Sequence, residues 1–257
     1  MKDDPRLLSI DRPPPPPRDP LKYVDDGGES LWLRLVRGLA IGVSAATWLA
    51  LCGFAWVLMV GWVSDACAAE PPARAMQYQR DLTREARAVW GLDAPVAVMA
   101  AQVHQESAWR PDAESPYAQG LAQFTPATAA WMAELYPVLD PVDVWHPQWA
   151  LRALVRYDRL LWERYATPAA TACDRWAFTL SSYNGGAGWV QRDRRQCRAA
   201  QRCPACDPAR WWGHVEETPD PRRADWAVRE NRGYPRRILL TLQPRYAGWG
   251  PEVACPH

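Results

Sequence analysis

Residues 106–128 read ESAWRPDAESPYAQGLAQFTPAT, and this stretch decides how the whole chain is interpreted. Its Ser-Pro pair and Gly120 are typical of a tight loop. Pro126 is suited to the first turn of a helix, where the missing N–H costs nothing. We therefore expect a helix that ends near Glu106, a loop that carries Gln123, and a second helix that begins at Pro126.

The segment before this stretch has the pattern of an amphipathic helix. Asp93 is a good N-cap, and Pro95 falls in the first turn that such a cap would begin. Apolar residues then recur at helical spacing and define one inward face, which consists of Val96, Met99, Ala100 and Val103. Glu106 continues this stripe, so its carboxyl group is expected at the C-terminal edge of the helix on the apolar side.

A glutamate in that position has the properties of a general acid. Desolvation and the negative end of the helix dipole both favour the protonated form of the carboxyl group. A protonated carboxyl group near neutral pH is what general acid catalysis requires. The spacing alone predicts a solvated glutamate in the last helical turn equally well.

The stretch that begins at Glu106 resembles the catalytic signature of the soluble lytic transglycosylase (SLT) family, whose core fold is shared with goose-type lysozyme. Further motifs follow in the family's order. They are Asp140-Pro141 before the helical stretch Trp149 to Tyr165, then Ser182-Tyr183-Asn184-Gly185-Gly186, then Glu230-Asn231-Arg-Gly-Tyr234-Pro-Arg-Arg-Ile238. The resemblance runs from about Gln77 to Leu242 and implies a mainly α, lysozyme-like domain.

The resemblance implies cleavage of the β-1,4 bond between N-acetylmuramic acid and N-acetylglucosamine in peptidoglycan, with a 1,6-anhydromuramic end as product. Glu106 would protonate the leaving oxygen and then, as a base, accept the proton of the muramoyl C6 hydroxyl that attacks C1. Ordinary glycosidases use a second carboxylate, which acts as the nucleophile or activates water. In this family the N-acetyl group of the substrate is thought to assist, and no metal or organic cofactor is implied.

The resemblance also assigns substrate-binding residues, which are Ser107, Gln123, Tyr183, Asn184, Glu230 and Tyr234. The first would orient Glu106 or the acetyl group, the next three would hold the saccharide, and the last two would shape the cleft wall. Gly185-Gly186 predict the end of the helix that carries Tyr183. Gln123 and Asn184 each have a plainer interpretation, in which the first satisfies loop backbone groups and the second caps a turn.

The chain departs from the family pattern at several places. The loop from Ser115 to Gly120 is one residue shorter than usual, and Ala122 stands where Met is common. Pro235 follows Tyr234, and a proline disfavours α geometry at the preceding residue, so we expect a helix to begin anew near Tyr234. The stretch Arg192 to Glu217 matches no part of the pattern and is interpreted as an insertion.

The segment from Gly38 to Ser64 carries no charged residue and is long enough, as a helix, to cross the roughly 30 Å hydrocarbon core of a bilayer. Because Arg34 and Arg37 precede it, the positive-inside rule places the N-terminus in the cytoplasm and the domain outside. A cleaved signal peptide is the alternative, since Ala66-Cys67-Ala68 resembles a cleavage site, but the apolar run exceeds a usual signal-peptide core. Either way the rest of the chain is exported.

These features divide the chain into four segments: a cytoplasmic Pro-rich disordered tail (1–37), a transmembrane helix (38–64), a linker (65–75) and the lysozyme-like lytic transglycosylase domain (76–257). The tail contains five consecutive prolines, which favour polyproline II and disorder over a packed core. The predicted location is the bacterial inner membrane, crossed once, with the catalytic domain in the periplasm.

Cysteine usage in the domain points to disulfides. The five cysteines beyond the linker are Cys173, Cys197, Cys203, Cys206 and Cys255. Disulfides are the default in an oxidising compartment. A zinc site at Cys203-Pro-Ala-Cys206 is the alternative, although no second pair of ligands stands at the usual spacing. The odd count leaves one thiol free, or paired with Cys67 or another chain.

Tryptophan and arginine are both frequent in the domain. Most tryptophans are expected in the core, and the adjacent Trp211 and Trp212 are predicted to supply sugar stacking at the cleft. A cluster of arginines is interpreted as a solvated helix face, and attraction of anionic wall polymer is the alternative. The cluster consists of Arg192, Arg194, Arg195, Arg198 and Arg202. The formal net charge of +1 argues against a dedicated nucleic-acid binder.

Two other functions stay open at this point. A hydrolytic, lysozyme-like muramidase would let water rather than the C6 hydroxyl reach C1. A non-catalytic scaffold would grip peptidoglycan to place a membrane machine, but Glu106, Ser107 and Gln123 together argue for catalysis. The expected partners are peptidoglycan strands and the cytoplasmic membrane, and local wall remodelling would suit a conjugation, secretion, pilus or phage-entry machine.

Overall fold

The structure, a computed structural model, describes residues 70–200 and 205–255 of the chain. The predicted transmembrane segment and the Pro-rich tail lie outside these residues. Among the helices that are described, none combines the length and the apolar character that a membrane crossing needs.

The described residues are helical, and no β-strand occurs among them. In chain order the elements are α3 (Ala73–Met76), α4 (Gln79–Trp90), α5 (Val96–Ser107), α6 (Pro126–Leu135), η2 (Pro137–Leu139), α7 (Pro147–Arg164), α8 (Ala172–Gly185), α9 (Ala187–Ala199), η3 (Val215–Glu217), α10 (Asp225–Arg236), η4 (Arg237–Leu242) and η5 (Gln243–Trp249). Two isolated bridges pair Gln119 with Glu114 and with Phe124 in the loop before α6. The prediction of a mainly α domain is therefore confirmed for this part of the chain.

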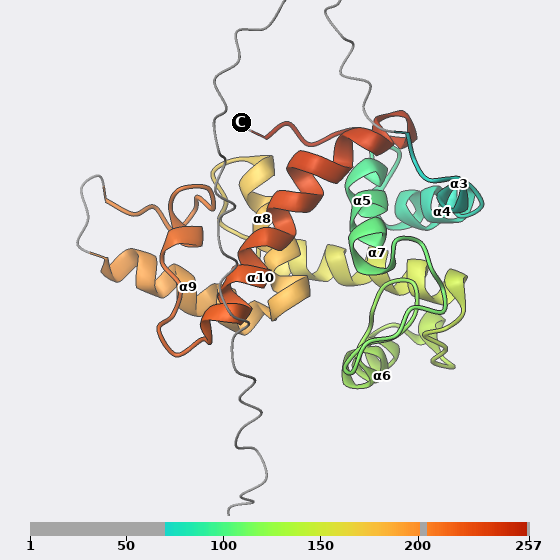
Figure 1. Cartoon of the computed structure of the whole chain (residues 1–257), viewed down its shortest axis with the longest axis horizontal. Coiled ribbons are helices and arrows are strands. Elements are labelled where there is room, and N and C mark those ends of the chain that lie inside the picture. Colours follow the sequence, from blue (N-terminus) through green and yellow to red (C-terminus); the bar gives the residue numbers. More distant parts are fainter. Residues whose placement is uncertain (1–69, 201–204, 256–257) are drawn as a thin grey trace, which may run out of the picture. The chain divides into compact units, whose positions relative to one another are not determined.

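Helix α5 is the most deeply buried helix of the fold and packs against α4, η4 and η5 (Figure 1). Every residue from Val96 to Val103 is buried and all but Gln102 are apolar, so the buried surface extends round the helix and is almost entirely apolar. A helix that is apolar all round belongs in a core. The predicted stripe is confirmed as buried, but it is only one part of the buried surface.

The start of α5 differs from the expectation. The helix begins at Val96, and Asp93 makes no side-chain cap hydrogen bond to it. The backbone N–H groups of Ala94 and Val96 instead bond to the carbonyl oxygens of Gly91 and Ala94. A turn therefore occupies the residues that Asp93 was predicted to cap, and the helix starts after it.

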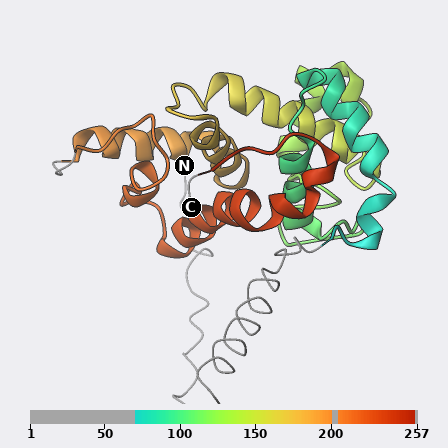
Figure 2. The same cartoon turned by 90° about the horizontal axis from the view of Figure 1, so that it is seen from above.

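The remaining long helices surround this core. Helix α7 packs against α4 and α8, and α8 packs in turn against α9 and α10 (Figure 2). Tryptophan fills much of the space between them, because the rings of Trp90, Trp162 and Trp176 contact one another at centroid distances of 5.2–5.6 Å. Trp176 is a core residue as expected, and Trp90 and Trp162 are partly buried against the core.

The helix predicted to begin anew near Tyr234 does not do so. Helix α10 runs through Pro235 to Arg236 and continues as η4, a π-helical segment. The N–H of Arg237 contacts the carbonyl oxygens of both Gly233 and Tyr234. Pro235 lies inside α10, just before the π-helical segment, and its missing N–H leaves a gap in the regular hydrogen-bond ladder there.

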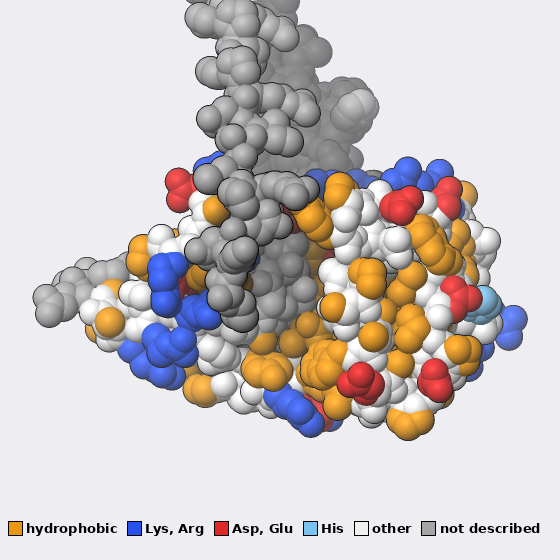
Figure 3. Space-filling view, turned by 90° about the horizontal axis from the view of Figure 1, so that it is seen from below, with side chains coloured by type: hydrophobic (Ala, Val, Ile, Leu, Met, Phe, Trp, Pro, Cys, Tyr) orange, Lys and Arg blue, Asp and Glu red, His pale blue; other side chains and the backbone are white. Residues whose placement is uncertain are grey.

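The arginine cluster on α9 is only partly a solvated face. Arg side chains gather at the α9 end of the molecule in the view from below (Figure 3), and Arg195 and Arg198 are exposed there. Arg194, in contrast, is buried, with its guanidinium over the ring of Phe178. It donates hydrogen bonds to three carbonyl oxygens of the α7–α8 loop, so the prediction is wrong for this residue.

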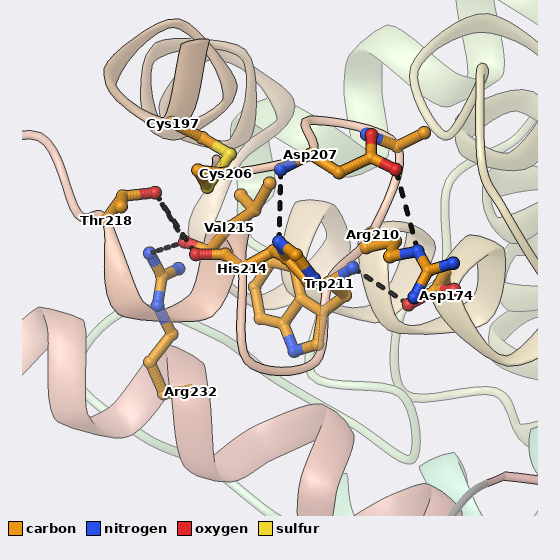
Figure 4. Close-up of a disulfide and its surroundings, with 11 residues drawn as sticks. Asp174, Cys197, Cys206, Asp207, Arg210, Trp211, His214, Val215, Thr218 and Arg232 are labelled. Carbon is orange, nitrogen blue, oxygen red and sulfur yellow. Dashed lines mark hydrogen bonds and ion pairs between the residues drawn. A yellow bond between two sulfur atoms is a disulfide. The ribbon is translucent and has the colours of Figure 1, made fainter. Parts of the chain in front are cut away.

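The stretch interpreted as an insertion folds back onto α8 and α10 (Figure 4). Trp211 donates its backbone N–H to Asp174 Oδ1 at 2.8 Å, and Arg232 Nη2 donates to the carbonyl oxygen of Val215 at 3.3 Å. Disulfides join Cys197 to Cys206 and Cys173 to Cys255. The preference for disulfides is confirmed for these four cysteines, and Cys203 lies outside the described residues.

Candidate active site

A cleft of about 950 Å³ opens beside the C-terminal end of α5, and Glu106 lines it. One side is formed by the loop of residues 115–125 and the first turn of α6, and another side by α10. The last turn of α8 also contributes. Segments that are far apart in the sequence therefore meet around one carboxyl group.

The backbone after Glu106 turns sharply away from the helix axis. Ala108 and Trp109 both adopt left-handed conformations, with φ of 51° and 65°. Such angles are uncommon outside glycine and need support from their surroundings. The support is Trp109, which is buried and donates its indole N–H to Tyr246 Oη at 2.7 Å. The turn ends α5 at Ser107 and leaves Glu106 in its last turn, beside the cleft.

The Glu106 carboxyl group has few partners. Tyr234 donates a hydrogen bond to Glu106 Oε1, and no ion pair joins Glu106 to an arginine of the described residues. Burial raises the pKa of Glu106 to about 8; the hydrogen bond from Tyr234 lowers it and the charge of Glu230 raises it. The expectation that desolvation favours the protonated form is thereby confirmed. A proton held at neutral pH is available for donation.

The loop opposite α10 is fixed by its own hydrogen bonds. Gly120 has φ of 77°, and any Cβ there would overlap the carbonyl oxygen of Val144, so only glycine fits. Gln123 lines the cleft but donates its Nε2 to the carbonyl oxygens of Ala113 and Gly120, at 3.0 and 2.9 Å. Gln123 thus satisfies loop backbone groups, as the plainer interpretation predicted. Its Oε1 is the atom that would contact a sugar.

The end of α8 brings two predicted residues into the cleft. The helix ends at Gly185, as expected, with Gly186 at φ of 90°. Tyr183 donates its Oη to the carbonyl oxygen of Ala122 at 2.7 Å, which ties α8 to the opposite loop. Asn184 donates its Nδ2 to Glu230 Oε1 at 3.4 Å, a long bond that places these two side chains against each other.

Six of the seven predicted site residues line the same cleft, namely Glu106, Gln123, Tyr183, Asn184, Glu230 and Tyr234. Ser107 does not. It is buried, and its Oγ donates to the carbonyl oxygen of Val103 within the same helix at 3.3 Å. The structure therefore gives Ser107 a contact within α5 rather than a place in the cleft.

The predicted tryptophan pair lies elsewhere. Trp211 is fully buried edge-on against Phe178, and Trp212 donates its indole N–H to Cys173 Sγ at 3.0 Å. Both sit in a turn rather than a helix or strand, and a turn can direct neighbouring side chains to different buried sites. The tryptophans that line the cleft are Trp189 and Trp226.

Several cleft residues were missed by the sequence analysis. They are Tyr117, Trp189, Arg222, Arg223, Trp226, Arg229 and Arg237. For α10 a signal was present, because Trp226, Glu230 and Tyr234 recur every four residues and share a face with the recognised motif. No group of His, Cys, Asp and Glu side chains within the described ranges is arranged to hold a metal ion.

Comparison with known proteins gives two matches. Residues 82–203 match a family model described as "Transglycosylase SLT domain". A curated protein of Marinobacter nauticus, "Membrane-bound lytic murein transglycosylase F", is 30% identical over 167 residues, which cover 63% of this chain and 30% of that protein. The chain thus spans under a third of the length of this relative. The family match includes Glu106 and Gln123, and α10 lies beyond it.

Proposed function

We propose that this chain, which matches the transglycosylase SLT domain family over residues 82–203, cleaves the glycan strands of peptidoglycan as a lytic transglycosylase. The observation that carries the proposal is Glu106, a desolvated carboxyl group with a pKa of about 8 in a cleft of about 950 Å³. At neutral pH this group holds the proton that the leaving sugar oxygen needs.

In the proposed reaction Glu106 acts twice. As an acid it protonates the oxygen of the β-1,4 bond between N-acetylmuramic acid and N-acetylglucosamine. Because Tyr234 already donates to Oε1, the transferable proton belongs on Oε2. As a carboxylate, Glu106 then accepts the proton of the C6 hydroxyl as its oxygen attacks C1, and a 1,6-anhydromuramic end results. Glu106 is thereby reprotonated for the next cycle.

The other cleft residues support this chemistry by position. Tyr234 holds one oxygen of Glu106 and stabilises the carboxylate that forms after proton donation. Asn184 and Gln123 offer amide groups to the N-acetyl and hydroxyl groups of the sugars. Tyr183 holds the Ala122 carbonyl and so keeps the loop in place. Ser107 supports the end of α5 from inside the helix.

A hydrolytic muramidase is the second candidate, and one observation favours it. Glu230 lines the same cleft as Glu106 and its charge acts on the Glu106 pKa. Hydrolytic glycosidases use such a second carboxylate to activate water or to attack C1. In the transglycosylase, Glu230 instead positions Asn184.

Mass spectrometry of the products distinguishes the two candidates. Purified peptidoglycan digested with the full-length protein should yield 1,6-anhydromuramic ends, and Glu230→Gln should still produce them. Reducing muramic ends that depend on Glu230 would establish the hydrolase instead. No product from the wild-type protein, with binding that survives Glu106→Gln, would indicate a scaffold.

We also propose that the domain lies in the periplasm, tethered to the inner membrane by residues 38–64 to remodel the wall locally for a membrane machine. The uncharged 38–64 segment and the two disulfides support this location. A periplasmic reporter fused after His257 should be active, whereas one fused before Leu31 should be inactive. Activity of the second fusion would contradict the orientation.

A further inference from the structure

One face of α10 and the start of η4 lines the cleft. The lining residues on this face recur at intervals of three or four positions and are Trp226, Ala227, Arg229, Glu230, Gly233, Tyr234 and Arg237. Tyr234 and Glu230 are already engaged with Glu106 and Asn184. Four other residues of this face are not engaged in this way, and we call them the α10 wall. They are Trp226, Arg229, Gly233 and Arg237.

The two arginines of the α10 wall are available for a ligand. Arg229 and Arg237 are exposed, and neither forms an ion pair or hydrogen bond with the described residues. The other cleft arginines are occupied, because Arg222 pairs with Asp220 and Arg223 donates to Asn231. A free guanidinium at a cleft recognises carboxylates with two parallel hydrogen bonds.

Space is also left between these arginines. Gly233 lies midway, four residues from each, and a Cβ at Gly233 would meet nothing within 4 Å. Along a helix, eight residues correspond to about 12 Å. The α10 wall therefore presents two cations on either side of an open, side-chain-free position.

The charge balance of the cleft favours an anionic ligand. Arg229 and Arg237 are the arginines of its described lining without an ion-pair partner, and the carboxyl groups of the lining are Glu106 and Glu230. Glu106 is largely neutral at pH 7 because burial raises its pKa to about 8. The amide and hydroxyl groups of the amino sugars carry no charge and need no cation. The carboxylates of a peptidoglycan strand are on the peptides attached to its muramic acid residues.

Two exposed aromatic side chains line the same cleft as these cations. Trp226 is 66% exposed and Tyr117, on the loop side of the cleft, is 81% exposed, although both line the cleft. Aromatic rings of this kind offer an apolar face for a sugar ring. Trp226 lies three residues before Arg229, so a ring for the sugar and a cation for its substituent occupy adjacent positions on one helix face.

We infer that the α10 wall binds the carboxylates of the stem peptides while the sugars lie in the cleft, so that peptide-bearing strands bind more tightly than uncharged ones. The inference rests on the proposed function, because it takes peptidoglycan as the ligand. It assigns Arg229 and Arg237 as specificity-determining residues.

The test compares two forms of one ligand on the full-length protein carrying Glu106→Gln. One is a soluble muropeptide oligomer, and the other is the same oligomer with its peptide carboxylates converted to amides. The acid form should bind more tightly. Adding Arg229→Gln and Arg237→Gln should weaken acid-form binding about five- to twentyfold, as expected for two exposed ion pairs, and weaken amide-form binding much less. Arg195→Gln, an exposed arginine of α9 outside the cleft, is the matched control.

Added salt should reduce the advantage of the acid form, because exposed charge pairs are screened. The inference would be overturned if the two forms bound with equal affinity or if neither form bound. It would also be overturned if the arginine variant lost equal affinity for both forms. Digestion of sacculi by the wild-type protein tests the proposed function separately. Sacculi that are cut while both forms bind equally would refute only the inference. Intact sacculi with tighter binding of the acid form would refute only the activity.

Discussion

Two glutamates in this domain, Glu85 and Glu106, are both desolvated, but their pKa values shift in opposite directions. Glu85 of α4 lies at the interface with α7, where Arg152 donates to both of its oxygens at 3.2 Å and Arg156 adds a contact at 3.4 Å. Burial pushes the pKa of Glu85 upward, but the bonds and charges of the two arginines outweigh it and lower the pKa. Glu106 has a tyrosine and no cation, and its pKa rises to about 8.

The difference shows that burial alone does not decide whether a carboxyl group is charged or protonated. A buried carboxylate with paired cations joins two helices and keeps its charge. A desolvated carboxyl group without a cation keeps its proton, and such groups are found where a reaction needs an acid. The α4–α7 interface is therefore expected to carry stability, and the cleft is expected to carry activity.

The same substitution at the two sites should separate these roles, beginning with Glu106→Gln. The amide keeps the shape of the side chain but has no proton to give, so turnover of peptidoglycan should fall at least about 10²–10⁴-fold. Folding and peptidoglycan binding should stay close to wild type. The measurement is the release of soluble muropeptides.

Glu114→Gln is the control for this change, because Glu114 is exposed in the loop and does not line the cleft. It should retain most activity. An inactive Glu114→Gln together with an active Glu106→Gln would reverse the assignment of the acid.

Glu85→Gln should show the opposite behaviour. Removing one partner of a buried pair leaves uncompensated charge on Arg152 and Arg156, which should lower the free energy of unfolding by about 2–4 kcal/mol. Turnover per folded molecule should not change, because Glu85 is remote from the cleft lining. Urea denaturation and a muropeptide-release assay on the same sample measure both. A large loss of turnover without a loss of stability would contradict a purely structural role for Glu85.

Tyr234→Phe should shift the pH dependence of the reaction. The reaction needs protonated Glu106, so activity should fall as pH rises through a pKa of about 8. The bond from Tyr234 favours the carboxylate and lowers this pKa, so the phenylalanine variant should lose activity at a higher pH. A hydrogen bond to a charged group is worth about 1.5–3 kcal/mol, which corresponds to a shift of about one unit or more. Initial rates from pH 5 to 10 measure it, and a shift toward acid would contradict it.

Asp158 of α7 sharpens the comparison with a third buried carboxyl group. Gln102 donates its Nε2 to Asp158 Oδ1 at 3.2 Å, while Asp158 Oδ2 and Gln102 Oε1 have no partner. A proton on Oδ2 could satisfy both, and burial raises the pKa of Asp158 well above its usual value. Because Asn in place of Asp158 offers the same donor and acceptor, Asp158→Asn should change stability at neutral pH by about 1 kcal/mol or less.

The sign of the pH effect follows from proton binding. The folded state keeps the Asp158 proton above pH 4, whereas the unfolded chain loses it near its usual pKa of about 3.9. The stability that this group contributes is therefore complete at low pH and is lost as pH rises toward the folded pKa. Asp158→Asn should lack this part of the pH dependence in urea titrations. A strong destabilisation by Asn at pH 7 would show that Asp158 is ionised.

The parts of the fold that depend on local spacing were predictable from the sequence. The stripe ending at Glu106, the end of α8 at Gly185 and the start of α6 at Pro126 all follow from residues within one or two turns. Six of the seven predicted site residues meet in the cleft because the recognised motifs surround it. Their substrate roles stay predictions.

The sequence predictions that were wrong concern contacts between residues far apart in the sequence. The burial of Arg194 depends on carbonyl groups almost thirty residues away, in the α7–α8 loop. Trp211 is buried because its backbone reaches Asp174 on α8. The free arginines of the α10 wall could not be distinguished from paired ones, since pairing is set by neighbours such as Asp220 and Asn231.

The most direct test of the account is the pKa of Glu106 itself. Infrared difference spectra of the full-length protein, taken across a pH titration, can be compared between wild type and Glu106→Gln to isolate this one carboxyl group. We expect a protonated carboxyl band that disappears near pH 8 and is absent from the variant. Titration near the ordinary value of 4.5 would contradict it, because Glu106 would then hold no proton to donate at neutral pH.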